Sequence, residues 1–402
     1  MEKKSLYPSP FPDSLHNPHV QVVSGKDAYK NTIQALSDID LTTIKGKKVL
    51  LKPNAGRIAN PGSGITTNPQ VVAAAIDTFH KAGARVAVGE SPITGVNVIE
   101  AFESSGIASV VRERNCPLLD MDVGQPAKTA IRDGIVIQSI KVCSVVFDYD
   151  IVVSIPVMKT HMHTGVTLAI KNMKGCLWRR SKVELHMLSR IEGIDDMPLD
   201  IAIADMSSIL RPSLSIIDGT TGMEGLGPSA GEAKRLDVIV TGIDSFAVDS
   251  IACSLMGLDA NKVPHLRIGA ERGYGVIDIS RIKVSPDTWR ESSSPFKPPP
   301  LNLSIQFPGI TILDEQSCSA CQSTLLLFLK RYGEELFDYF PGKDNLTIAI
   351  GKGHKSVSSE TLCIGNCANQ HRNDCIFVPG CPPVASQILK VISTQNPKSN
   401  PK

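Results

Sequence analysis

Six cysteines lie in the last quarter of the chain, and four of them have a spacing suited to binding a metal. Cys318 and Cys321 are separated by two residues, so one turn of the backbone can present both thiols to the same metal. Cys367 and Cys381 come later, in Gly365-Asn-Cys367 and Gly380-Cys381, and the glycines let the backbone pass close to a bulky group. We predict that these four thiols are the ligands of one metal site.

Four thiolates can hold either a zinc ion or an iron–sulfur cluster. Structural zinc sites usually contain two short-range pairs of ligands, whereas this segment contains one such pair. Proline directly follows Cys381, as it follows the last ligand in some cluster-binding sequences. The pattern therefore favours a [4Fe-4S] cluster as the cofactor, with zinc and unligated thiols as the alternatives. Cys363 and Cys375 compete for the same positions, and the flanking glycines favour Cys367 and Cys381.

The composition is that of an ordinary globular protein with 42% apolar and 20% charged residues. The formal net charge is only +2, so we expect no general attraction to nucleic acid or to a membrane surface. No apolar run reaches the roughly 18 residues that membrane insertion requires, and the N-terminus lacks the apolar run of a signal peptide. Ten cysteines in a chain of 402 residues without such a signal argue against a disulfide framework, and we expect a cytoplasmic protein.

Short apolar runs alternate with amphipathic segments along most of the chain. This alternation predicts an α/β fold with a mostly parallel, doubly wound sheet and a second, smaller cysteine-rich α/β domain. A well-marked helix should begin at Pro69, after the capping residue Asn68, and end at Gly83. Strands are expected at 20–23, 48–51, 85–88, 135–137, 150–155, 214–217 and 238–241.

Changes in composition divide the chain into four parts. Residues 1–17 should be a flexible N-terminal arm, and residues 18–289 a ligand-binding α/β domain. A stretch rich in proline and serine predicts a linker over 290–300. Residues 301–395 should then form the cysteine-rich, cluster-binding domain, with strands at 303–313, 346–350 and 376–378.

Polar residues follow several of the strands predicted in the large domain. In open α/β sheets, ligands bind in the crevice beyond the carboxyl ends of the strands. We therefore expect one ligand-binding crevice at this edge, in preference to a set of solvated loops. Its expected residues are Asn54, Glu90, Lys159, His161 and Asp218.

The stretch from Thr164 to Lys174 carries two hydroxyls and two ammonium groups. If a helix begins near Thr164, then Thr164, Thr167, Lys171 and Lys174 share one face of it. Positive charge at a helix N-terminus suits an anionic ligand, so Lys171 and Lys174 join the predicted ligand-binding residues. A solvated basic face is the alternative interpretation.

Several short motifs occur together in a characteristic order. They are Leu51-Lys-Pro-Asn54, Thr67-Asn-Pro69, Val88-Gly-Glu-Ser-Pro92, Lys159-Thr-His161 through Lys174-Gly175, Asp218-Gly219 and Ala247-Val-Asp249. With these motifs the chain resembles the domain of unknown function 362 family over roughly residues 45–280. The resemblance implies that iron–sulfur ligands are common in such proteins, but it implies no general reaction.

Together these observations predict an iron–sulfur redox protein that transfers electrons to or from a small anionic ligand held in the large domain. A redox partner protein is a further expectation, and no catalytic residue is assigned. One alternative is a non-redox isomerase or transferase that acts on a carboxylate and has a structural metal. Another is a metal- or cluster-binding maturation module.

Overall fold

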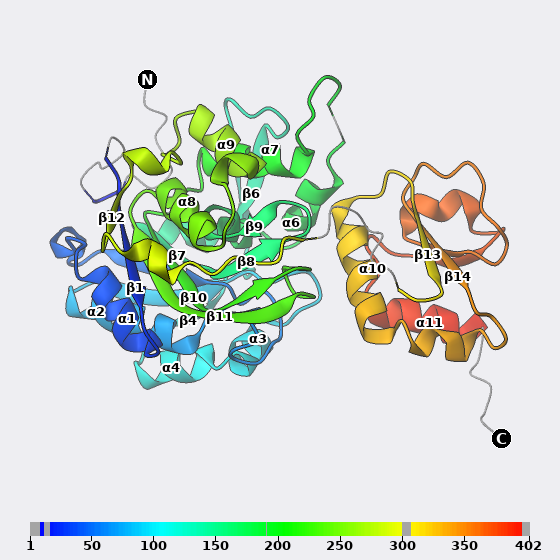
Figure 1. The fold of residues 1–402 in the computed structure, drawn as a ribbon, viewed down its shortest axis with the longest axis horizontal. Coiled ribbons are helices and arrows are strands. Elements are labelled where there is room, and N and C mark those ends of the chain that lie inside the picture. Colours follow the sequence, from blue (N-terminus) through cyan, green and yellow to red (C-terminus); the bar gives the residue numbers. More distant parts are fainter. Residues whose placement is uncertain (1–8, 12–16, 190, 300–306, 396–402) are drawn as a thin grey trace. The chain divides into compact units, whose positions relative to one another are not determined.

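The computed structural model describes residues 9–11, 17–189, 191–299 and 307–395 (Figure 1). The chain divides into two compact units, Met1–Leu185 with Ser189–Pro299, and His186–Leu188 with Pro300–Lys402. Each unit contains strands and helices, and the predicted α/β fold class is confirmed. The predicted arm over 1–17 lies outside the described residues except for 9–11 and 17.

The large unit is built on one mixed sheet that is parallel through its centre. The strand order is β12 (Lys283–Ser285), β1 (His19–Ser24), β11 (Glu232–Gly242), β10 (Leu214–Glu224), β7 (Ile151–Ile155), β2 (Lys48–Pro53), β3 (Arg85–Glu90) and β4 (Leu118–Asp120). From β10 to β4 each neighbouring pair is parallel, and β11 runs antiparallel to both of its neighbours. Strand β8 (Val157–His161) pairs with β10 and with β9 (Gly165–Thr167), while β5 (Pro126–Ala130) and β6 (Ser139–Cys143) form a separate ribbon.

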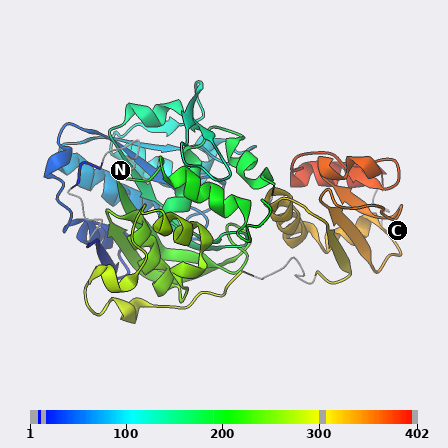
Figure 2. The ribbon, with the colours of Figure 1, turned by 90° about the horizontal axis from the view of Figure 1, so that it is seen from above.

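Helices cover both faces of this sheet (Figures 1 and 2). One face packs against α1 (Ala28–Leu36), α2 (Pro69–Lys81) and α4 (Ile107–Glu113), and the other against α5 (Ala169–Asn172) and α8 (Ser245–Leu255). The remaining helices of this unit are α3 (Val98–Ser104), α6 (Ser181–Glu184), α7 (Pro198–Ser207) and α9 (Pro264–Glu271). Both faces of the central strands are therefore buried, which explains their continuous apolar runs.

Local signals determine where helix α2 begins and ends. The Asn68 side chain accepts a hydrogen bond from the Gln70 N–H at 2.9 Å, and Pro69 occupies the first turn, where no N–H is needed. Gly83 follows the helix with φ +80°, which a residue with a side chain rarely adopts. The helix predicted from these residues is confirmed.

The second unit has a four-stranded parallel sheet of its own. Its strands are β13 (Ile310–Asp314), β14 (Leu346–Ile350), β15 (Leu362–Ile364) and β16 (Ile376–Val378), and they lie in that order. Helices α10 (Ser319–Tyr332) and α11 (Ala385–Gln395) pack on the sheet through Leu325, Phe328, Ile388 and Ile392. The first part of the strand predicted at 303–313 lies outside the described residues.

The helix predicted to begin near Thr164 is wrong. Residues 165–167 form strand β9, which pairs with β8 across a tight turn that places Gly165 at φ +74°. Helix α5 begins only at Ala169, where the carboxylate of the buried Asp249 accepts the N–H groups of Ala169 (2.7 Å) and Ile170 (3.0 Å). Thr164, Thr167, Lys171 and Lys174 therefore do not share the face of a single helix.

The strand predicted at 135–137 is also wrong, because these three residues bind a side chain instead of another strand. Their backbone N–H groups donate to the carboxylate of Asp205 at 2.9–3.2 Å. The same carboxylate is fully buried and forms an ion pair with Arg272 at 2.6 Å. The apolar run Ile135-Val-Ile137 resembles a strand, and the sequence does not show that its backbone binds a distant carboxylate.

The glycine-rich segment after Asp218 continues the sheet. Strand β10 runs through it to Glu224, and a Cβ at Gly222 would overlap the carbonyl oxygen of Met158 on β8. A Cβ at Gly227 would likewise overlap the carbonyl oxygen of Thr160. These two glycines permit close packing of backbone on backbone.

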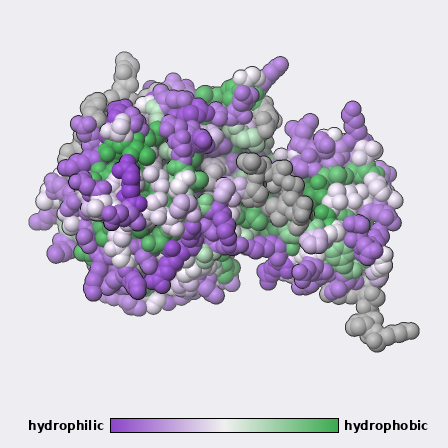
Figure 3. Space-filling model, viewed as in Figure 1, coloured by the Kyte–Doolittle hydropathy of each residue, from purple (hydrophilic) through white to green (hydrophobic). Residues whose placement is uncertain are grey.

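The segment predicted as a linker is partly packed on the large unit. Phe296 is buried and its N–H donates to the carbonyl of Met256 at 2.8 Å, while the N–H of Lys297 donates to the carboxylate of Glu224 at 3.0 Å. Figure 3 shows mostly hydrophilic residues on the visible face of this unit, with apolar residues in separate small areas. Among the helices of the described residues, none combines the length and apolar character of a membrane span.

We expect Asp205→Ala to destabilise the large unit by about 3–5 kcal/mol, because it leaves Arg272 and three N–H groups without their partner. Both tryptophans, Trp178 and Trp289, belong to this unit, so urea unfolding followed by tryptophan fluorescence measures the effect. Asp196→Ala is the matched control: Asp196 binds Arg267 at 2.7 Å at a more exposed position, and its loss should cost about 1 kcal/mol or less. Equal losses in the two variants would contradict the role given to Asp205.

Candidate functional site

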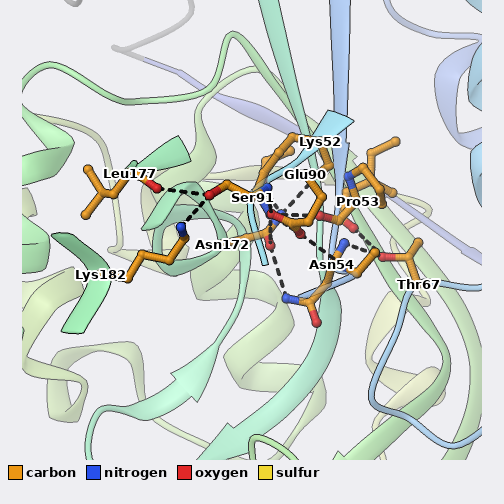
Figure 4. A network of polar contacts seen from close by, with 12 residues as sticks. Lys52, Pro53, Asn54, Thr67, Glu90, Ser91, Asn172, Leu177 and Lys182 are labelled. Carbon is orange, nitrogen blue, oxygen red and sulfur yellow. Dashed lines mark hydrogen bonds and ion pairs between the residues drawn. The ribbon is translucent and has the colours of Figure 1, made fainter. Parts of the chain in front are cut away.

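A buried ion pair between Lys52 and Glu90 lies where β2 and β3 end (Figure 4). The two residues are each 1% exposed, and Lys52 Nζ donates to Glu90 Oε2 at 2.7 Å. Lys52 also donates to the carbonyl of Pro53 at 2.8 Å and to Asn172 Oδ1 at 3.0 Å. All three protons of the ammonium group thus have acceptors, which a buried cation requires.

Both oxygens of the Glu90 carboxylate also accept hydrogen bonds. Its Oε2 also accepts the N–H of Ala55 at 3.0 Å, and its Oε1 accepts the N–H of Ser91 at 2.9 Å. Gly175 lies directly against the pair, and a Cβ at this position would overlap both Glu90 Oε1 and the end of the Lys52 side chain. Glycine is therefore required at 175 for steric reasons.

Asn54 connects the ion pair to Lys159 on strand β8. Its Nδ2 donates to Asn172 Oδ1 at 3.1 Å, and its Oδ1 accepts a hydrogen bond from Lys159 Nζ at 2.8 Å. Lys159 is 2% exposed and also donates to the carbonyl of Ile65 at 2.8 Å. The structure thus brings Asn54, Glu90 and Lys159 into one polar network, although the sequence separates them by up to 105 residues.

Further cations surround this network. Burial lowers the pKa of Lys159 well below its ordinary value, and the charges of Lys171, Arg57 and Lys52 lower it further. Burial likewise lowers the pKa of Lys171 to about 7, opposed by Asp200 and assisted by Arg57. The pKa of Lys174 is also lowered, first by burial and then by the charge of Lys171. A buried amine near other cations is readily deprotonated, and its positive form is stabilised by an anion.

Asp218 acts electrostatically on Lys159, and His161 lies two residues after Lys159 on the same strand. Asp218 is buried on β10 and accepts the N–H of Asn68 at 2.7 Å, so it also supports the start of α2. Burial raises the pKa of Asp218, and the charge of Lys159 acts in the opposite direction. His161 follows Lys159 on β8, and its Nδ1 accepts the N–H of His163 at 3.1 Å.

A second lysine centre extends the network beyond Ser91. Lys182 Nζ donates to Ser91 Oγ, whose hydroxyl donates to Asp122 at 2.6 Å, and Lys182 lies 3.9 Å from the same carboxylate (Figure 4). Burial lowers the pKa of Lys182, while Asp122 opposes the shift. This centre was not predicted, because Lys182 lies outside the motifs that the sequence made visible.

The four predicted metal ligands lie beyond the carboxyl ends of three parallel strands in the second unit. Cys318 and Cys321 follow β13, Cys367 follows β15, and Cys381 follows β16. A hydrogen bond from the Cys321 thiol lowers the pKa of Cys318 to about 6, and backbone N–H groups at the start of α10 add to this effect. The same bond raises the pKa of Cys321, as do burial and the charges of Cys318, Cys367 and Cys381.

The pKa of Cys367 also depends on the neighbouring thiols. Burial raises its pKa, as do the charges of Cys318 and Cys381, whereas the charge of Lys352 lowers it. Cys363 forms a separate pair with Cys375. Burial raises the pKa of Cys363, and its hydrogen bond with Cys375 raises the pKa further. Within the described ranges, no group of three or more His, Cys, Asp or Glu side chains is arranged to hold a single metal ion.

Residues 49–254 match the family described as a domain of unknown function, DUF362. This match covers more than half of the chain. The chain belongs to the DUF362 family. The region shared with other DUF362 proteins contains the whole polar network from Lys52 to Asp249, whereas the six cysteines of the second unit follow it. The family resemblance predicted from the sequence motifs is confirmed.

A curated relative of this DUF362 protein is the thylakoid-associated protein sll1697 of Synechocystis sp. (strain ATCC 27184 / PCC 6803 / Kazusa). The two are 28% identical over 219 residues, which are 54% of this chain and 66% of the relative. The match therefore spans slightly less than two thirds of the relative. Among solved structures, lactate racemase apoprotein from Thermoanaerobacterium thermosaccharolyticum aligns with 96% of this chain and 82% of its own, at a TM-score of 0.40 and 11% identity.

Several residues of the network were not among the predicted site residues. Lys52 and Asn172 stand inside or next to the DUF362 motifs, so their position in these motifs was the available signal. Arg57 stands in the loop after β2 and had no comparable signal. Asp249 lies in the last motif, but its contact with α5 depends on the tertiary fold.

We expect Gly175→Ala to lower the free energy of unfolding of the large unit by about 1–3 kcal/mol, because the added methyl group must displace the Lys52–Glu90 pair. Gly56→Ala is the control, since a Cβ there would come no closer than 3.9 Å to any neighbouring atom and should change stability by about 0.5 kcal/mol or less. Tryptophan fluorescence during urea unfolding measures both variants. A Gly175→Ala protein as stable as the control would show that the pair tolerates a side chain at this position.

Proposed function

We propose that this DUF362 protein is an iron–sulfur redox protein. In this proposal the second unit binds a [4Fe-4S] cluster through Cys318, Cys321, Cys367 and Cys381. The cluster supplies one-electron transfer when bound, and the electrons pass to or from a small anionic ligand in the large unit. The observation that carries the proposal is that Cys318, Cys367 and Cys381, from three strand ends, all raise the pKa of Cys321.

The donor set fits such a cluster chemically. Metal binding needs thiolates, and Cys318 has a pKa of about 6, so it is largely ionised at neutral pH. The positive charge of Lys352, at the end of β14, favours the thiolate of Cys367. Gly365 lies close to the predicted ligands, because a Cβ at this position would be only 3.3 Å from Cys321 Sγ. The absence of a side chain at Gly365 therefore leaves space beside this thiol. Cys363 and Cys375 interact with each other, so in the proposal they are not ligands.

The ligand of the large unit is held by cations in this proposal. Lys159 and Lys171 attract an anion, Lys174 adds to the positive potential, and Asn54 orients Lys159. The amine of Lys171 can accept or donate a proton near neutral pH, because burial lowers its pKa to about 7. His161 and Asp218 complete the predicted crevice, and Glu90 keeps Lys52 in place.

The proposal includes a reducing compartment such as the cytoplasm, where thiols remain available for a cluster. The name of the Synechocystis relative associates that protein with thylakoids, and we include a membrane-associated redox partner protein among the partners to be tested. We propose neither membrane insertion nor nucleic-acid binding. No apolar run in the sequence reaches the roughly 18 residues that insertion requires, and the net charge of +2 gives no general attraction to nucleic acid.

Anaerobic purification of the full-length protein, followed by iron, sulfide and zinc analysis, tests the proposal. We expect about four iron and four sulfide ions per chain. Cys367→Ser and Cys381→Ser should each lower the iron content strongly, because each removes a ligand. Cys375→Ser is the matched control in the same segment, and it should retain the iron of the unchanged protein.

Two results would contradict the proposal. Stoichiometric zinc without sulfide would favour the alternative of a non-redox isomerase or transferase with a structural metal. Iron that is lost in Cys375→Ser but retained in Cys367→Ser would show that the ligand set is wrong.

A further inference from the structure

Three cations around the polar network have no carboxylate within ion-pair distance in the described part of the chain. They are Arg57, Lys159 and Lys171. Lys159 donates only to neutral oxygens there, the side-chain oxygen of Asn54 and the carbonyl of Ile65. Arg57 and Lys171 make no hydrogen bond within the same residues. Lys171 lacks these partners although it is buried: only 9% of the residue is exposed to water.

Other buried lysines of the same unit are neutralised by the fold. Lys52 is bound to Glu90 at 2.7 Å, and Lys182 lies 3.9 Å from Asp122. Burying an uncompensated charge is unfavourable, and proteins usually supply such charges with partners. The different treatment of the two groups of cations therefore indicates that a ligand supplies the missing negative charge.

The charge of Glu90 also reaches Lys159, but Glu90 is already bound to Lys52. Two further carboxylates act on these cations, and both likewise have other partners. Asp218 interacts electrostatically with Lys159, but its oxygens accept backbone N–H groups and a threonine hydroxyl. Asp200 acts on Lys171, but it is bound to Nδ1 of the buried His265 at 3.1 Å. Neither carboxylate can satisfy the ammonium groups directly without giving up these bonds.

Two buried hydroxyls near Lys159 also have no hydrogen-bond partner. Thr167 Oγ1 belongs to the residue paired with Lys159 across β8 and β9. Thr66 Oγ1 belongs to the residue after Ile65, whose carbonyl accepts from Lys159. Buried hydroxyls normally form hydrogen bonds, so these two can donate to the oxygens of a ligand.

We propose that the ligand is a small polyvalent oxyanion, a phosphate ester or a polycarboxylate with at least two negative charges. Arg57, Lys159 and Lys171 bind its anionic groups, and Thr66 and Thr167 donate to its oxygens. One carboxylate would leave two of the three cations without a counterion. The planar guanidinium of Arg57 suits two oxygens of a carboxylate or phosphate, and Arg57 is partly exposed, so it can receive the ligand from solvent. This inference deepens the proposed function and rests on the site assigned there.

Calorimetric titration of the full-length protein with pyrophosphate, citrate and acetate tests the inference. We expect pyrophosphate or citrate to bind at least about tenfold more tightly than acetate. Tighter binding of pyrophosphate would assign the phosphate class, and tighter binding of citrate the polycarboxylate class. Acetate binding as tightly as both polyanions, or no binding of either polyanion by the folded protein, would overturn the inference.

Variants identify the groups responsible. Arg57→Met, Lys171→Met and Thr167→Val should each weaken binding of the preferred polyanion, the first two by about tenfold or more. Lys171→Met should also raise the melting temperature of the ligand-free protein, because it removes a desolvated amine. Lys26→Met, at an exposed position, is the control and should change neither quantity. Unchanged affinity in both Arg57→Met and Lys171→Met would overturn the assignment.

Iron content measured on the same samples separates this inference from the proposed redox function. Polyanion binding by a protein without iron or sulfide would support the ligand class and contradict the redox function. An iron-loaded protein that binds neither polyanion would support the redox function and contradict the ligand class.

Discussion

The ion pair between Lys52 and Glu90 occupies a dry position where two parallel strands end, and much of the large unit is arranged around it. Each polar atom of the pair needs a partner, and the fold supplies them from the loops after β2 and β3 and from helix α5. The same closeness explains why Gly175 has no room for a side chain. The pair also fixes Asn172, which in turn holds Asn54 beside Lys159. One neutralised pair thus positions the cations that the fold does not neutralise.

Both units use the same geometric property of parallel sheets. The carboxyl ends of neighbouring parallel strands lie along one edge, so residues far apart in sequence come together there. In the large unit these residues are cations and amides, which suit an oxyanion. In the second unit they are thiols after β13, β15 and β16, with Lys352 after β14. The chemistry that we propose for each unit follows from the side chains that its strand ends carry.

Features with local causes could be predicted from the sequence. The start of α2 depends on Asn68 and Pro69, and the positions of the cysteines at strand ends follow from short apolar runs before them. The helix expected near Thr164 and the strand expected at 135–137 failed because distant carboxylates, those of Asp249 and Asp205, bind these backbones. Site residues at strand ends, such as Asn54, were accessible to the same reasoning. The absence of a counterion at Lys171 could not be predicted, because it depends on which side chains the fold places nearby.

The large unit buries amines whose charge no carboxylate among the described residues balances. NMR of the ligand-free, full-length protein labelled with ¹³C at lysine Cε measures the protonation of each amine directly. We expect a signal that titrates with a midpoint near pH 7 and disappears in Lys171→Met, because burial lowers the pKa of this group to about 7. An added polyanion should move that midpoint upward, since a negative charge stabilises the protonated amine. Titration of Lys171 near the ordinary value of 10.5 would show that this amine is not buried without a balancing charge.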